Sequence, residues 1–134
     1  MRTKLMVVVA AAGLVLAAAP LRAHHAFAAE FDQDKPIKVQ GSVTKWELTN
    51  PHSWIYIDVK DLDGKVATWM IEGASPNNLY RLGLTKESLP AGSMITVEGY
   101  QAKDGSTRAV GRNITFANGK KFFLGLMEAE GAPK

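Results

Sequence analysis

The fold is indicated first by residues 54–72, WIYIDVKDLDGKVATWMIE. Ile55, Ile57 and Val59 alternate with polar or larger side chains, which is the two-residue period of a half-buried strand. Asp61-Leu62-Asp63-Gly64 has the composition of a tight turn. The last seven residues of the stretch then form a second strand. Together these features predict an antiparallel hairpin and a mainly β protein.

The residues before this hairpin predict another strand with a bend in it. Ile37, Val39, Gly41 and Val43 share one face, and the apolar positions then change parity at Trp46 and Leu48. A change of parity within one strand indicates an extra residue, as in a β-bulge. With the hairpin, this segment completes a three-stranded meander.

The residues after the hairpin predict one short helix. Ser75 is a suitable cap and Pro76 is favoured at the first helical position. Leu79 and Leu82 are then expected to face the core before Gly83 ends the helix.

One further turn is expected at residues 85–89, followed by strands at 94–100 and 108–116. Asn118-Gly119 predicts a tight turn before a last strand at 121–124. The predicted order is three strands, a helix and then two or three strands. This is the order of a small five- to six-stranded OB-like barrel, with the helix between the third and fourth strands. A β-sandwich or an open roll would give much the same pattern.

The first 23 residues have the three parts of a cleavable export signal. Arg2 and Lys4 supply the positive start, an apolar run of about 15 residues follows, and Leu21-Arg22-Ala23 precedes the expected cut. The run is too short for a membrane span of about 20 residues. Cleavage after Ala23 makes His24 the first residue, whereas a rival cut after Ala28 would remove it.

The expected organisation is therefore a signal peptide at 1–23, an N-terminal arm at 24–35, the OB-like domain at 36–126 and a flexible tail at 127–134. The location is periplasmic or secreted, without a membrane anchor after cleavage. The chain has 16 Lys+Arg and 13 Asp+Glu, and loss of Arg2, Lys4 and Arg22 leaves 13 of each. A neutral mature domain does not favour nucleic-acid binding. The absence of cysteine excludes thiol chemistry and disulfides.

The candidate site residues are His24, His25 and His52, the only histidines in the chain. An N-terminal histidine can chelate Cu(II) through its α-amino nitrogen and its imidazole, and a second imidazole completes a three-nitrogen set. Glu30 and Asp32 could add an oxygen. Zinc is the second choice, because a closed structural zinc site needs four ligands. The alternative is that these histidines are solvated polar residues at a terminus and in a turn.

The tryptophans, the Asp61–Gly64 segment and the strand glutamates are not assigned to a functional site. Trp46, Trp54 and Trp69 are interpreted as core residues rather than as a ligand platform. Asp61–Gly64 is interpreted as a hairpin turn rather than a calcium loop, because it lacks the later acidic ligand. The glutamates on strands lack an evident second carboxylate partner, so no catalytic activity is expected; these are Glu47, Glu72 and Glu98.

Three motifs, taken in their order along the chain, resemble those of a known protein family. They are His24-His25-Ala26-Phe27-Ala28-Ala29-Glu30-Phe31-Asp32, then Thr49-Asn50-Pro51-His52-Ser53-Trp54, then Ser75-Pro76-Asn77. Together they resemble a family of short exported bacterial proteins classed as a domain of unknown function. The resemblance implies a signal peptide, one small β domain and a His-His start, with no activity to transfer.

Two functions follow from these observations. One is copper binding through the mature N-terminal histidine. The other is a non-catalytic OB-type module that binds a peptide, a small molecule or an envelope protein through its loops and aromatic residues.

Overall fold

The computed structural model describes residues 30–124, and within them the protein is mainly β, as predicted. The elements are β1 (Phe31–Leu48), β2 (Ser53–Lys60), β3 (Val66–Gly73), helix α3 (Pro76–Arg81), the 3-10 turn η1 (Lys86–Ser88), β4 (Met94–Ala102), β5 (Arg108–Phe116) and β6 (Lys121–Phe123). The expected signal peptide, His24, His25 and the tail at 127–134 lie outside the described residues.

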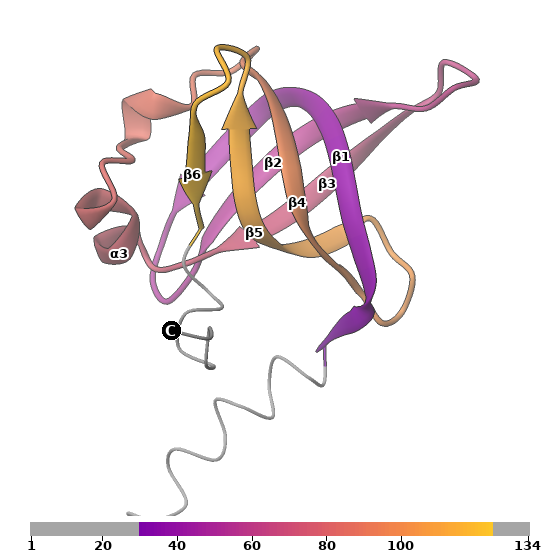
Figure 1. Cartoon of the computed structure of the whole chain (residues 1–134), viewed down its shortest axis with the longest axis horizontal. Helices are drawn as coiled ribbons and strands as arrows, with labels where there is room; N and C mark the ends of the chain where they lie inside the picture. The colour runs from indigo at the N-terminus through magenta and orange to yellow at the C-terminus, as the bar shows by residue number, and fades with distance from the viewer. Residues whose placement is uncertain (1–29, 125–134) are drawn as a thin grey trace, which may run out of the picture. The chain divides into compact units, whose positions relative to one another are not determined.

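All six strands belong to one sheet, in the order β3-β2-β1-β4-β5-β6. Neighbours in this order are antiparallel. In addition, β3 pairs in parallel with β5 through Met70–Arg108, Ile71–Ala109 and Glu72–Val110. The pairings therefore lead from β3 through β2, β1, β4 and β5 back to β3, and Figure 1 shows β1, β4 and β5 curving in front of β2 and β3.

A bulge in β1 accounts for the change of parity seen in its sequence. Val43 pairs with Ile57 and Lys45 with Tyr56, so Thr44 is the extra residue. As a result, Trp46 packs against the core after the bulge as Val43 does before it. The bend is confirmed. β1 begins at Phe31, earlier than residue 36, where the sequence placed the start of the domain.

The β2–β3 hairpin turns at the predicted residues. Asp61 accepts hydrogen bonds at Oδ1 from the backbone N–H of Asp63 (2.9 Å) and of Lys65 (2.8 Å). Gly64 has φ +83°, a conformation that glycine adopts without steric cost. The tip projects away from the rest of the sheet, as Figure 1 shows. The side chain of Asp61 thus holds the turn that sets the register of β2 against β3.

Helix α3 starts as predicted but ends earlier than expected. Ser75 Oγ accepts a hydrogen bond from the Asn78 backbone N–H (3.4 Å), and Pro76 is the first helical residue. Leu79 is fully buried, whereas Leu82 is 43% exposed, so the prediction that Leu82 faces the core is wrong. The helix ends at Arg81, and Gly83 turns the chain at φ +87°; Leu84, 0% exposed, fills the core position instead.

The core lies between the inward faces of the strands, under α3 and η1. Its fully buried members come from β1 to β5, from α3 and from the residues that follow α3 and β6; they include Val43, Ile55, Ile57, Ile71, Leu79, Leu84, Ile95, Val97, Ile114 and Leu124. Trp46 and Trp69 pack against this cluster, as predicted. Trp54 does not belong to it and points to the opposite face of β2 from Ile55, so its assignment to the core is wrong. Within the described residues, no helix is long and apolar enough to cross a membrane.

Candidate functional site

Of the three predicted histidine ligands, only His52 lies within the described part of the chain. Of the two predicted oxygen donors, Asp32 lies on β1 and accepts a hydrogen bond from the Asp34 backbone N–H (3.0 Å), and Glu30 directly precedes β1.

His52 ends the loop between β1 and β2, which contains a cis peptide bond between Asn50 and Pro51. The next residue, Ser53, is fully buried, and its backbone N–H donates to the Ala74 carbonyl (3.0 Å). The backbone immediately after His52 is therefore fixed to the end of β3.

A glycine allows this close approach of the two strand ends. Ser53 pairs with Gly73, and a Cβ on Gly73 would lie 2.6 Å from Ser53 Oγ. Real Cβ atoms do not come this close to another heavy atom, so only glycine fits without a shift. The small residue at 73 thus keeps the His52 end of β2 close to the end of β3.

Glu72 is a buried carboxylate near the end of β3, on a strand that lies between β2 and β5. Its backbone neighbours are Trp54 on β2 and Val110 on β5. The residue is 7% exposed. Acidic side chains are rarely buried to this extent unless they are paired, because burial removes their hydration. A specific partner is therefore expected, and the structure provides one.

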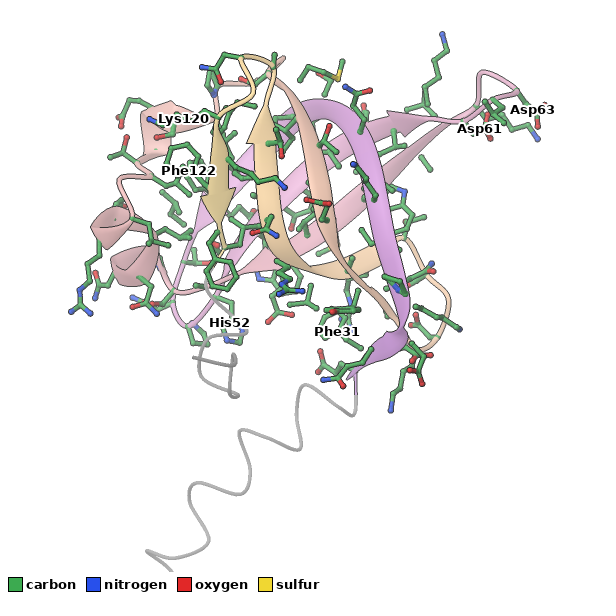
Figure 2. All side chains as sticks on the ribbon, viewed as in Figure 1. Phe31, His52, Asp61, Asp63, Lys120 and Phe122 are labelled. Atoms are coloured by element: carbon green, nitrogen blue, oxygen red, sulfur yellow. The ribbon has the colours of Figure 1, made fainter. Side chains whose placement is uncertain are left out.

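The partner is the imidazole of His52. Its Nδ1 contacts Glu72 Oε1, and Figure 2 shows His52 at the end of the strands opposite to the hairpin tip marked by Asp61 and Asp63. The His52 side chain is 42% exposed, against 9% for that of Glu72. In this arrangement Nδ1–H donates to the carboxylate, which fixes the tautomer and orientation of the ring. In the neutral ring, the lone pair of the second nitrogen, Nε2, is then available for a ligand.

Arg108 adds a cation to the same end of the sheet. It opens β5 in register with Met70, two pairs away from the Glu72–Val110 pair along the parallel ladder. Its guanidinium Cζ lies 5.4 Å from the centroid of the Phe31 ring, within the range of a cation–π interaction. Phe31 is itself buried, with 3% of its surface exposed. This contact therefore ties together the first residues of β1 and β5.

A second polar cluster lies on the outer face of β1 and β2. Lys45 Nζ pairs with Glu47 Oε1, and Tyr56 Oη donates to Glu47 Oε2 (3.3 Å). The hydrogen bond with Lys45 lowers the pKa of Glu47, and the hydrogen bond with Glu47 raises the pKa of Lys45. Burial, followed by the Glu47 charge, raises the pKa of Tyr56. Glu47 is thus an ionised carboxylate engaged by two neighbours.

The described residues contain no group of three or more His, Cys, Asp or Glu side chains that could hold a metal ion by itself. His24 and His25 are outside these residues, so whether they approach His52 stays a prediction. Sequence reasoning missed Glu72 as a partner of His52. The signal was present in the hairpin: the turn at Asp61 sets Glu72 opposite Trp54, two residues from His52.

Comparison with known proteins places the chain in a family. Residues 10–112 match the model of a family of unknown function, DUF6152. The match covers most of the chain and includes both His52 and Glu72; the protein belongs to this family. Membership of an uncharacterised family agrees with the prediction. No curated protein matches the chain, and neither does any solved structure.

Proposed function

We propose that the mature protein is a periplasmic or secreted copper-binding protein. In this proposal His24 chelates Cu(II) through its α-amino and imidazole nitrogens, and His52 supplies a further nitrogen through Nε2. His25 is the alternative source of the second imidazole. The observation that carries the proposal is the contact between His52 Nδ1 and the buried carboxylate of Glu72.

This contact is the arrangement usual for a histidine that binds a metal. Such a histidine commonly donates its other ring N–H to a carboxylate, a backbone carbonyl or water, which orients the ring and makes the ligand nitrogen more basic. Glu72 is well suited to this task, because its backbone is held by strands on both sides and its side chain has little freedom. A solvated turn histidine would not require a buried carboxylate beneath it.

The predicted terminus supplies donors that favour copper. An ordinary α-amino group has a pKa of about 8 and loses its proton when a metal competes for it. An amine with two imidazoles is a nitrogen set for which Cu(II) outcompetes the other divalent first-row metals. Zinc is less suitable, because its closed sites use four protein ligands. The chain has three histidines and no cysteine.

We further propose that the sheet is an OB-type barrel. The circuit of pairings through β1, β2, β3, β5 and β4 supports this, as do the bulge in β1 and the helix between β3 and β4. In OB folds the loop between the first two strands commonly contacts the ligand. His52 lies in this loop. The role proposed is binding rather than catalysis.

Equilibrium Cu(II) titration tests the proposal. The variants are the protein beginning at His24, the same protein with one alanine before His24, and His52→Ala. We expect one copper per chain in the first, and at least tenfold weaker binding in each of the other two. Lys60→Ala, at the far end of β2, is the matched control and should bind as the first protein does. Unchanged affinity after blocking the terminus or after His52→Ala would overturn the proposal.

A further inference from the structure

A groove lies on the outer face of β1, β4 and β5. Its volume is about 400 Å³, within the range of roughly 300–1,000 Å³ typical of small-molecule sites. Residues from all three strands line it, including Pro36, Ile37, Lys38, Tyr100, Arg112 and Asn113. None of these residues has a part in the proposed copper site.

A second bulge places Arg112 in this groove. Glu98 pairs with Asn113, but the next residue of β4, Gly99, pairs with Gly111. Arg112 is therefore the extra residue on β5, and a bulge re-aims the side chain at that point. Gly99 makes the approach of the strands feasible, because a Cβ there would lie 1.9 Å from the Val110 carbonyl oxygen. The bulge thus places the Arg112 side chain in the lining of the groove.

The charges in the groove are not balanced. Glu98 pairs with Lys121, its Oε2 lying 3.4 Å from Nζ. Lys38 and Arg112 are exposed, and neither forms an ion pair with another described residue. Lys38, on β1, is the cross-strand partner of Glu98, and Arg112 is the chain neighbour of Asn113, the partner of Glu98 on β5. Both cations therefore lie on strands that flank Glu98. The groove therefore has two positive charges that can attract an anion.

The next cross-strand pair on the same face is mainly apolar. Pro36 pairs with Tyr100, two residues along the strands from the Lys38–Glu98 pair. Two residues of a strand span about 6.6 Å. A ligand that reaches from the ring of Tyr100 to the cations therefore needs an apolar body separated from its charge by about this length.

We propose that this groove binds a small organic carboxylate with an apolar body. The carboxylate meets Arg112 and Lys38, because the planar guanidinium matches a carboxylate with two parallel hydrogen bonds. The Asn113 side chain offers a further donor. The apolar body packs on Pro36 and Tyr100. This site is independent of copper and does not rest on the proposed function.

The test uses 3-phenylpropionate as the probe and 3-phenylpropanol as its neutral counterpart. Amide NMR shifts of the full mature protein, recorded without copper, report where each binds. We expect saturable shifts confined to residues of β1, β4 and β5 around the groove. Binding should be at least tenfold weaker for the alcohol and for Arg112→Gln. Lys38→Gln, at an exposed position, should also weaken binding and provides a second variant.

Lys60→Gln is the matched control, because it removes a cation from the hairpin and should leave probe binding unchanged. Shifts that map elsewhere would overturn the proposal, as would equal binding of the alcohol. So would wild-type affinity in Arg112→Gln and Lys38→Gln. Each variant is checked by circular dichroism, so that a loss of binding is read only from folded protein.

Discussion

Replacing Glu72 by glutamine should weaken copper binding while the fold is retained. Glutamine has nearly the same size, and the pairings of Glu72 with Trp54 and Val110 involve its backbone. What is lost is the carboxylate that contacts His52 Nδ1. Loss of such an orienting group typically costs roughly 10- to 100-fold in metal affinity, or about 1.4–2.8 kcal/mol.

The assay is a competition titration of Cu(II) against a chelator of known affinity. Glu72→Gln is compared with Glu98→Gln, another strand glutamate that is in an ion pair but remote from His52. A double-mutant cycle with His52→Ala isolates the coupling. In the His52→Ala background, Glu72→Gln should have no further effect, because the group it orients is gone.

Two results would refute this reasoning. One is unchanged copper affinity in Glu72→Gln. The other is an equal loss of copper affinity on Glu72→Gln in the presence and in the absence of His52, which would mean that the carboxylate does not act through His52. Chemical denaturation of the same variants shows whether a loss of affinity reflects unfolding instead.

Three further predictions concern the frame that holds the site. Leu79→Ala should lower the free energy of unfolding by about 2–5 kcal/mol, whereas Leu82→Ala, at a 43% exposed position, should change it by less than about 0.5 kcal/mol in urea denaturation. Gly111→Ala should cost about 1–3 kcal/mol by overpacking, because its Cβ would meet two side chains within 2.8 Å. Glu47→Gln should lower the pKa of Tyr56, seen as phenolate absorbance at lower pH, because the nearby carboxylate raises that pKa.

Each of these predictions has a clear contrary result. Equal destabilisation by Leu79→Ala and Leu82→Ala would contradict the position of the helix end. A Gly111→Ala protein as stable as the wild type would contradict the close packing at β5. For Tyr56, the titration is read as a difference from Tyr56→Phe, and an unchanged pKa after Glu47→Gln would show that burial alone raises it.

The strands could be predicted because their determinants are local. Alternation in β2 and the turn at Asp61 define the hairpin without any distant information. The bulge at Thr44 was visible as a change of apolar parity. The end of α3 was less predictable, because Leu82 and Leu84 are both apolar, and the backbone turn at Gly83 decides which one is buried.

The candidate site was predicted only in part, because it combines residues from different strands. His52 was identified by residue type and by its loop. Its partner Glu72 is 20 residues later in the chain and carries no motif of its own. The parallel pairing of Glu72 with Val110 joins segments that are still further apart, and strand alternation does not reveal such pairings. The burial that makes Glu72 informative is therefore a tertiary property.

The most direct test of copper binding at the mature terminus is native mass spectrometry of the exported protein, with and without copper. It determines the first residue and the metal stoichiometry in one measurement. We expect a chain that begins at His24 and retains one copper ion. A chain that begins at Ala29, or one that begins at His24 and retains no copper, would contradict it.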